Sequence, residues 1–249
     1  MAVSVDRVYQ KVLAMANKEQ RGYITPQEFN LFADFAQMDI FEQYFYDLEQ
    51  RQRGTGNEFD YADIISNIEE KISMFTIVDA AVGSITDGVA DISSAVSNLY
   101  RLGSVKVLYS TVGATNYKAA DKIQLNEINK YENSPLAAPT KFNPVYTKFS
   151  TVSDSHKIKV YPSPEAGDTV VVDYVRRPVK PNWTYIISTN NDALYNASAS
   201  DHQDFELHGS EETNLVVKIL QLAGIAIKDF NLVQAAGQKE ASDIQQEKL

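Results

Sequence analysis

The chain has 249 residues, a formal net charge of −10 and no cysteine. The acidic balance argues against a protein that binds by neutralising phosphates, because such binding depends on clustered Lys and Arg. The lack of cysteine excludes disulfides, thiol nucleophiles and zinc–thiolate sites. The length allows one large domain or two small ones. The N-terminus lacks the apolar run of a secretory signal, and no stretch approaches the roughly 20 apolar residues of a membrane span.

Three N-terminal segments carry apolar residues at helical spacing, and their ranges are 5–16, 26–48 and 61–75. Because the segments are joined by short connections, they predict an antiparallel helical bundle.

The second of these helices has a clear start signal. Thr25 is placed to cap the backbone, Pro26 suits the first helical position, and Glu28 can reach back to complete a capping box. Ile24 and Phe29 occupy the positions of a hydrophobic staple.

The middle of the chain is predicted to be rich in β-structure. The Asp87-Gly88 step favours a strand pair within residues 76–98. A strand is expected over 105–112 and a short helix over 121–131. Residues 158–161 and 169–175 alternate around a turn containing Pro and Gly, which predicts a hairpin that ends at Arg177-Pro178.

The last predicted element is a long helix. Ser210 is its expected N-cap, followed by Glu211 and Glu212 at the positive end of the helix dipole, and the helix is expected to run to about Gln246. The expected fold is therefore α+β: an N-terminal antiparallel helical bundle completed by a long C-terminal helix, with a β-rich middle insertion. The predicted regions are 1–75, 76–190 and 191–249.

Two segments match the sequence pattern of a cation-binding site. Residues 17–28 match a calcium loop in placing Gly22 sixth and Glu28 twelfth, but Arg21 stands where an oxygen ligand is needed. His202, Asp204, Glu206 and His208 occupy alternate positions, which on a strand would align all four as metal ligands on one face. A plain helix–turn–helix corner explains the first segment equally well, and a polar linker explains the second. No metal and no cofactor are therefore predicted.

Catalytic signatures are missing from the sequence. There is no G-x-S-x-G, no S-x-x-K, no Walker loop and no dinucleotide fingerprint. The protein is therefore not expected to be an enzyme.

A basic and aromatic group in the sequence gives the interface candidates Arg176, Arg177 and Trp183. Arg and Trp are enriched at interface hot spots, although Trp183 could equally cover a sheet edge.

Several segments together resemble head–tail connector (adaptor or ring) proteins of tailed phages, as in crAss-like and marine phages. The N-terminal segment is VYQKVLAMANKEQRGYITPQEFNLFADFAQMDIFEQYFYDL; later ones are LYRLGSV, NSPLAAPTKFNPVY, IKVYP, VVVDYVRRPVKPNWTY and DFELHGSEETNLVVKILQLAGI. They occur in a fixed order over most of the chain.

The resemblance implies a virion subunit that forms a homo-oligomeric ring, with twelve as the expected number of subunits. It implies contacts with the portal and with other connector or tail proteins, and a passage for DNA without specific nucleic-acid binding or a membrane. The alternatives are another virion structural subunit, such as a tail hub or fibre adaptor, and a calcium- or metal-binding regulatory protein.

Overall fold

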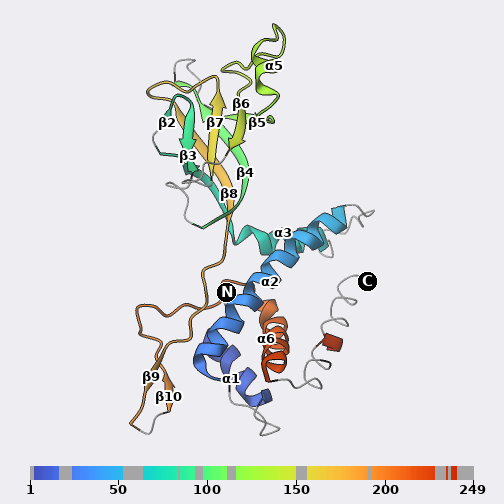
Figure 1. Cartoon of the computed structure of the whole chain (residues 1–249), viewed down its shortest axis with the longest axis vertical. Coiled ribbons are helices and arrows are strands. Elements are labelled where there is room, and N and C mark those ends of the chain that lie inside the picture. The colour runs from blue at the N-terminus through green and yellow to red at the C-terminus, as the bar shows by residue number, and fades with distance from the viewer. Residues whose placement is uncertain are drawn as a thin grey trace. The chain divides into compact units, whose positions relative to one another are not determined.

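The computed structural model divides the chain into two units (Figure 1). Unit 1 comprises Met1–Lys71 and Pro178–Leu249, and unit 2 comprises Ile72–Arg177. Unit 2 therefore ends before the predicted regional boundary at residue 190. The residues described are 3–16, 24–52, 64–83, 85–92, 98–110, 116–149, 156–189 and 192–227, with short pieces at 234 and 237–239.

Unit 1 is built mainly from helices. Its helices are α1 (Val5–Ala16), α2 (Pro26–Gln52), α3 (Ile64–Ser73, whose last two residues belong to unit 2), the 3₁₀ turn η3 (Gly209–Glu211) and α6 (Glu212–Ile227). Both α1 and α2 pack on α6. The segment after Pro178 lies on α2 through the fully buried Gln37, whose amide donates to the Val179 carbonyl (2.8 Å) and accepts from the Glu206 amide (3.1 Å).

The start of α2 has the predicted capping box. The Glu28 carboxylate accepts from the Thr25 amide at 3.0 Å and from its hydroxyl at 2.8 Å, while the Thr25 hydroxyl accepts from the Glu28 amide at 3.3 Å. These hydrogen bonds from Thr25 hold the pKa of Glu28 below its usual range. Ile24 and Phe29 are both buried. The sequence signal for this helix start is confirmed.

Unit 2 is an eight-stranded sheet, counted over the described residues, in the order β1-β8-β4-β5-β6-β7-β3-β2. The pairs are antiparallel except for β5 and β6. The strands are β1 (Thr76–Ala81), β2 (Ile85–Thr86), β3 (Val89–Asp91), β4 (Leu99–Leu108), β5 (Lys118–Lys122), β6 (Val145–Phe149), β7 (Lys157–Tyr161) and β8 (Thr169–Arg176). The short helix α5 (Ile128–Glu132) lies between β5 and β6.

One hydrophobic core takes side chains from both ends of this sheet. Ala90 of β3 and Val160 of β7 share it with Val105 of β4 and Val172 of β8, and all four are fully buried. Strands far apart in the order meet in one core, so the sheet is curled. Each core strand turns alternate residues inward, which explains the period-two pattern of the sequence.

The strand pair predicted around Asp87-Gly88 is confirmed. Ile85 faces Ala90, and Thr86 faces Val89, across a two-residue turn. Both turn residues have positive φ, 51° at Asp87 and 76° at Gly88, as a type I′ turn requires.

The hairpin predicted from 158–161 and 169–175 is wrong. Both segments are strands, but β7 pairs with β6 and β3, whereas β8 pairs with β4 and β1. The connection is fastened to the end of β4, because the Asp168 carboxylate accepts from the Ser110 amide (2.8 Å) and from the Glu165 amide (2.8 Å). The backbone ladder along both strands pairs β8 with β4, and this anchorage fixes the end at which the ladder begins.

Three predicted boundaries also change. The strand expected from Val105 begins at Leu99, and residues 121–122 of the helix expected over 121–131 belong to β5. The C-terminal helical segment starts with η3, whose N-cap is His208 and not Ser210, since the His208 ring accepts from the Ser210 amide at 3.3 Å.

The predicted bundle architecture is wrong, although the fold does combine helices with a sheet. The curled sheet dominates the fold, and α1 and α2 pack on α6 instead of forming a three-helix bundle with α3. Among the described side chains of α3 only Ile68 is buried, too little apolar surface to hold the helix in a bundle. The helix α6 is described as far as Ile227, and the rest of the long helix predicted to about Gln246 falls mainly outside the described residues.

Within the described part of the chain, no helix combines the length and apolar character that crossing a membrane demands.

Candidate assembly surfaces

Trp183 is buried within unit 1. Its ring is only 3% exposed and is 4.3 Å from that of Tyr9, measured between centroids. The indole Nε1 donates to the Asp6 carboxylate at 3.0 Å, and the backbone amide donates to the Asn30 side chain at 2.8 Å. Trp183 therefore joins α1 and α2 to the segment after Pro178. A role for Trp183 in binding another chain stays a prediction.

Trp183 also supports a small hairpin, the arm, formed by β9 (Tyr185–Ile187) and β10 (Ala193–Tyr195). The rings of Tyr185 and Tyr195, which face each other across the strands, each stack on Trp183 at 5.8 Å. The arm is fixed at its base by this aromatic contact and extends away from the helices of unit 1 (Figure 1).

The rest of the arm is apolar and exposed. Ile186 faces Leu194 across the strands, and each is 58% exposed; Ile187 is 64% exposed. Successive residues of a strand point to opposite faces, so apolar side chains stand on both faces. An isolated two-stranded hairpin is at best marginally stable in water, and exposed apolar surface of this kind is typical of interaction sites.

A second apolar surface lies on α2. Leu31, Phe35 and Tyr46 are 55%, 61% and 64% exposed, and their spacing places them on one side of the helix with Asp39 and Glu42. We call these five residues the α2 outer face. The opposite side of α2 is buried, so this helix carries large apolar side chains on both its buried and its exposed side, and the exposed ones form a candidate contact surface.

Arg176 and Arg177 lie at the end of β8 in unit 2, whereas Trp183 belongs to unit 1. The Arg177 guanidinium is 5.9 Å from the centre of the Tyr100 ring, and its backbone amide donates to the Asn98 carbonyl at 2.7 Å. A role for the two arginines at an interface stays a prediction.

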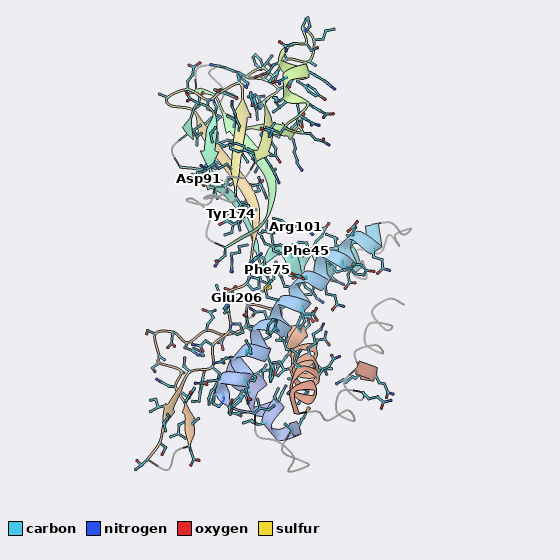
Figure 2. All side chains as sticks on the ribbon, viewed as in Figure 1. Phe45, Phe75, Asp91, Arg101, Tyr174 and Glu206 are labelled. Carbon is cyan, nitrogen blue, oxygen red and sulfur yellow. The ribbon has the colours of Figure 1, made fainter. Side chains whose placement is uncertain are left out.

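Sequence reasoning missed a basic pocket in unit 2. The pocket has a volume of about 520 Å³ and lies between β4 on one side and β6 and β7 on the other. Figure 2 labels Arg101 of β4, one of its lining residues. The other charged or aromatic lining residues are Tyr100, Lys148, Phe149, His156 and Lys157. An anionic group with an apolar neighbour matches such a lining.

Lys148 is the most distinctive cation of the basic pocket. Its side chain forms no ion pair with any residue that the structure describes. Partial burial, followed by repulsion from Lys122, lowers the pKa of Lys148. A carboxylate brought beside it would favour the charged form of Lys148 and so offset both effects.

The basic pocket could have been suspected from the distribution of charge. Unit 1 has 12 Lys and Arg against 23 Asp and Glu, a formal net charge of −11, whereas unit 2 has 11 against 10, a net of +1. The overall value of −10 therefore describes unit 1 alone. The cations of the pocket come from strands distant in sequence, so no local motif shows them.

The polar residues from His202 to His208 have mainly different partners, although the His202 Nε2 lies 3.7 Å from the Asp204 carboxylate. Asp204 accepts from the Val5 amide at 2.8 Å, Glu206 accepts from the Val179 amide at 2.8 Å, and His208 caps η3. His202 contacts the Tyr195 hydroxyl at 3.3 Å. The described residues contain no group of three or more His, Asp or Glu arranged to hold a metal. Residues 17–23 of the calcium-loop match lie outside the described residues, and Glu28 is engaged in the capping box.

A scan against protein-family models found no match for this chain, and a search of curated proteins found none either.

Proposed function

We propose that the protein is a non-enzymatic virion subunit that forms a ring in the head-to-tail connector of a tailed phage, between the portal and the tail. The proposal rests on the ordered sequence blocks that resemble such proteins and on one structural observation, the exposed apolar arm. Assembly in the host cytoplasm and residence in the virion belong to the same proposal.

The arm supports an assembly role because of its composition and its anchorage. Ile186, Ile187 and Leu194 are each more than half exposed, yet the hairpin is held at its base by Trp183. A surface loop with no partner would be expected to be polar, since apolar surface in water is unfavourable. A partner that covers both faces of the arm would remove this surface from water.

The charge of unit 1 supports the same proposal. Its formal net charge of −11 creates a repulsive potential toward phosphates. A channel wall with this charge would let DNA pass without holding it. The connector function therefore uses unit 1 both as an assembly module and as a surface that repels DNA.

The experiment measures the mass of the purified full-length protein by native mass spectrometry, alone and mixed with assembled portal rings. We expect either a closed ring or a monomer that joins portal rings at one copy per portal subunit. The proposal is refuted if the protein stays monomeric and does not bind portal rings at any concentration tested.

A variant pair then tests the arm. Ile186→Asp with Leu194→Asp places two charges on one face of the hairpin, and we expect it to abolish assembly. Ala197→Asp is the matched control, since this exposed residue lies just beyond the arm. Equal assembly of the arm variant and the control would show that the arm is not the contact.

A further inference from the structure

The α2 outer face combines apolar and acidic groups in one stripe. Glu42 is exposed and lies between Phe35 and Tyr46, about 10 Å and about 6 Å from them along the helix axis. It forms no ion pair with any described residue, whereas the neighbouring Asp39 pairs with Lys218. The stripe therefore presents one uncompensated carboxylate flanked by two exposed aromatic rings.

The basic pocket of unit 2 has the complementary composition. Lys148 is a cation without an ion-pair partner among the described residues, and the rings of Tyr100 and Phe149 form part of the same lining. A carboxylate between aromatic side chains would thus find a cation and an apolar wall together.

We propose that the α2 outer face of one copy of this chain binds the basic pocket of unit 2 of a second copy, with Glu42 beside Lys148. The inference rests on the proposed ring and names its subunit contact. Complementary charge selects this occupant, because unit 1 has a net charge of −11 and unit 2 of +1. Two different patches on one chain make a heterologous contact, which generates rings when the rotation closes.

A charge-exchange experiment tests the contact. Glu42→Lys and Lys148→Glu are made singly and together in the full-length protein, and assembly is followed by sedimentation velocity over a range of concentrations. Each single variant should weaken assembly at least tenfold by placing like charges together. The double variant restores opposite charges and should recover most of the lost affinity.

Two controls separate this pairing from a general effect of charge. Glu69→Lys on α3 and Lys130→Glu on α5 make the same charge changes at other exposed positions. Far-ultraviolet circular dichroism verifies that each variant is folded, and recovery in the double variant excludes misfolding as the cause. The inference is overturned if the controls weaken assembly as much as the test variants, or if the double variant assembles no better than the singles.

The remaining outcomes distinguish the inference from the proposed function. If wild type forms rings and the single variants form them equally well, the ring stands and this contact is wrong. If wild type is monomeric with and without the portal, both fail. A short single-stranded oligonucleotide is the last probe: loss of its binding in Lys148→Glu, with assembly unchanged, would assign the basic pocket to nucleic acid and overturn the inference.

Discussion

The hydrogen bond between Asp6 and Trp183 allows a quantitative test of how unit 1 is held together. Asp6→Ala leaves the buried indole N–H without its acceptor at 3.0 Å. Loss of a hydrogen bond to a charged group costs about 1.5–3 kcal/mol. Asp6 also lies in the first turn of α1, where a carboxylate contributes about 0.3–1 kcal/mol through the helix dipole. The expected loss in the free energy of unfolding is therefore about 2–4 kcal/mol.

The assay is urea denaturation followed by tryptophan fluorescence. Trp183 is the only Trp of the chain, so the signal reports unit 1 directly. With a slope of about 2 kcal/mol per molar urea, the middle of the usual range, the midpoint should fall by roughly 1–2 M.

Two further variants make this test decisive. Asp6→Asn keeps an acceptor oxygen but loses the charge, and it should cost only about 1 kcal/mol. Glu69→Ala, at an exposed position of α3, should change stability by less than about 0.5 kcal/mol. If Asp6→Ala unfolds at the same urea concentration as Glu69→Ala, the hydrogen bond does not stabilise unit 1 and the reasoning is refuted.

Two further predictions concern unit 2. Gly88→Ala should destabilise unit 2 by about 2 kcal/mol or more, since Gly88 has φ 76° and a Cβ there would lie 2.8 Å from the Val160 carbonyl oxygen. Thermal unfolding followed by near-ultraviolet circular dichroism measures this loss of stability, and an unchanged melting temperature would contradict the prediction. Burial raises the pKa of Asp168, but hydrogen bonds from Glu165 and Ser110 outweigh burial and hold the pKa below its usual range. The unfolded state then binds the proton more tightly, so the stability that Asp168 contributes is present above its unfolded pKa and is lost as pH falls through the lower folded value. Asp168→Asn should therefore be less stable than wild type at pH 7 and nearly equal to it near pH 2; a difference that persists unchanged in acid argues against this carboxylate.

Local signals in the sequence predicted local structure well. The capping box at Thr25 and the positive-φ turn at Asp87-Gly88 depend on residues a few positions apart, so the chain itself specifies them. Pairing of strands depends on distant partners. The alternation in β7 and β8 is the same whether they pair with each other or not. The ladder between β8 and β4 joins residues far apart in the sequence, and Asp168 fastens only one end of it.

The bundle prediction failed for a related reason. Helical spacing identified α1 and α2 and the buried side of α2, which carries Phe29, Ala33, Ala36, Ile40 and Tyr44, but spacing alone does not say which helices pack together. Phe35 and Phe41 are the same residue type in the same helix, yet Phe41 is fully buried and Phe35 is 61% exposed. The α2 outer face therefore became a candidate assembly surface only once the packing of α2 on α6 was known.

The net charge of the whole chain concealed an uneven distribution of charge between the two units. A net charge of −10 argued against binding by phosphate neutralisation, but a whole-chain charge does not show whether the acidic residues are spread evenly. They are concentrated in unit 1, and unit 2 is close to neutral with cations gathered around one pocket. Copies of such a chain repel each other when like units meet and attract when the acidic unit of one meets the basic pocket of another. The charge distribution therefore favours head-to-tail association over a symmetric dimer, and this preference should weaken as salt screens the charges.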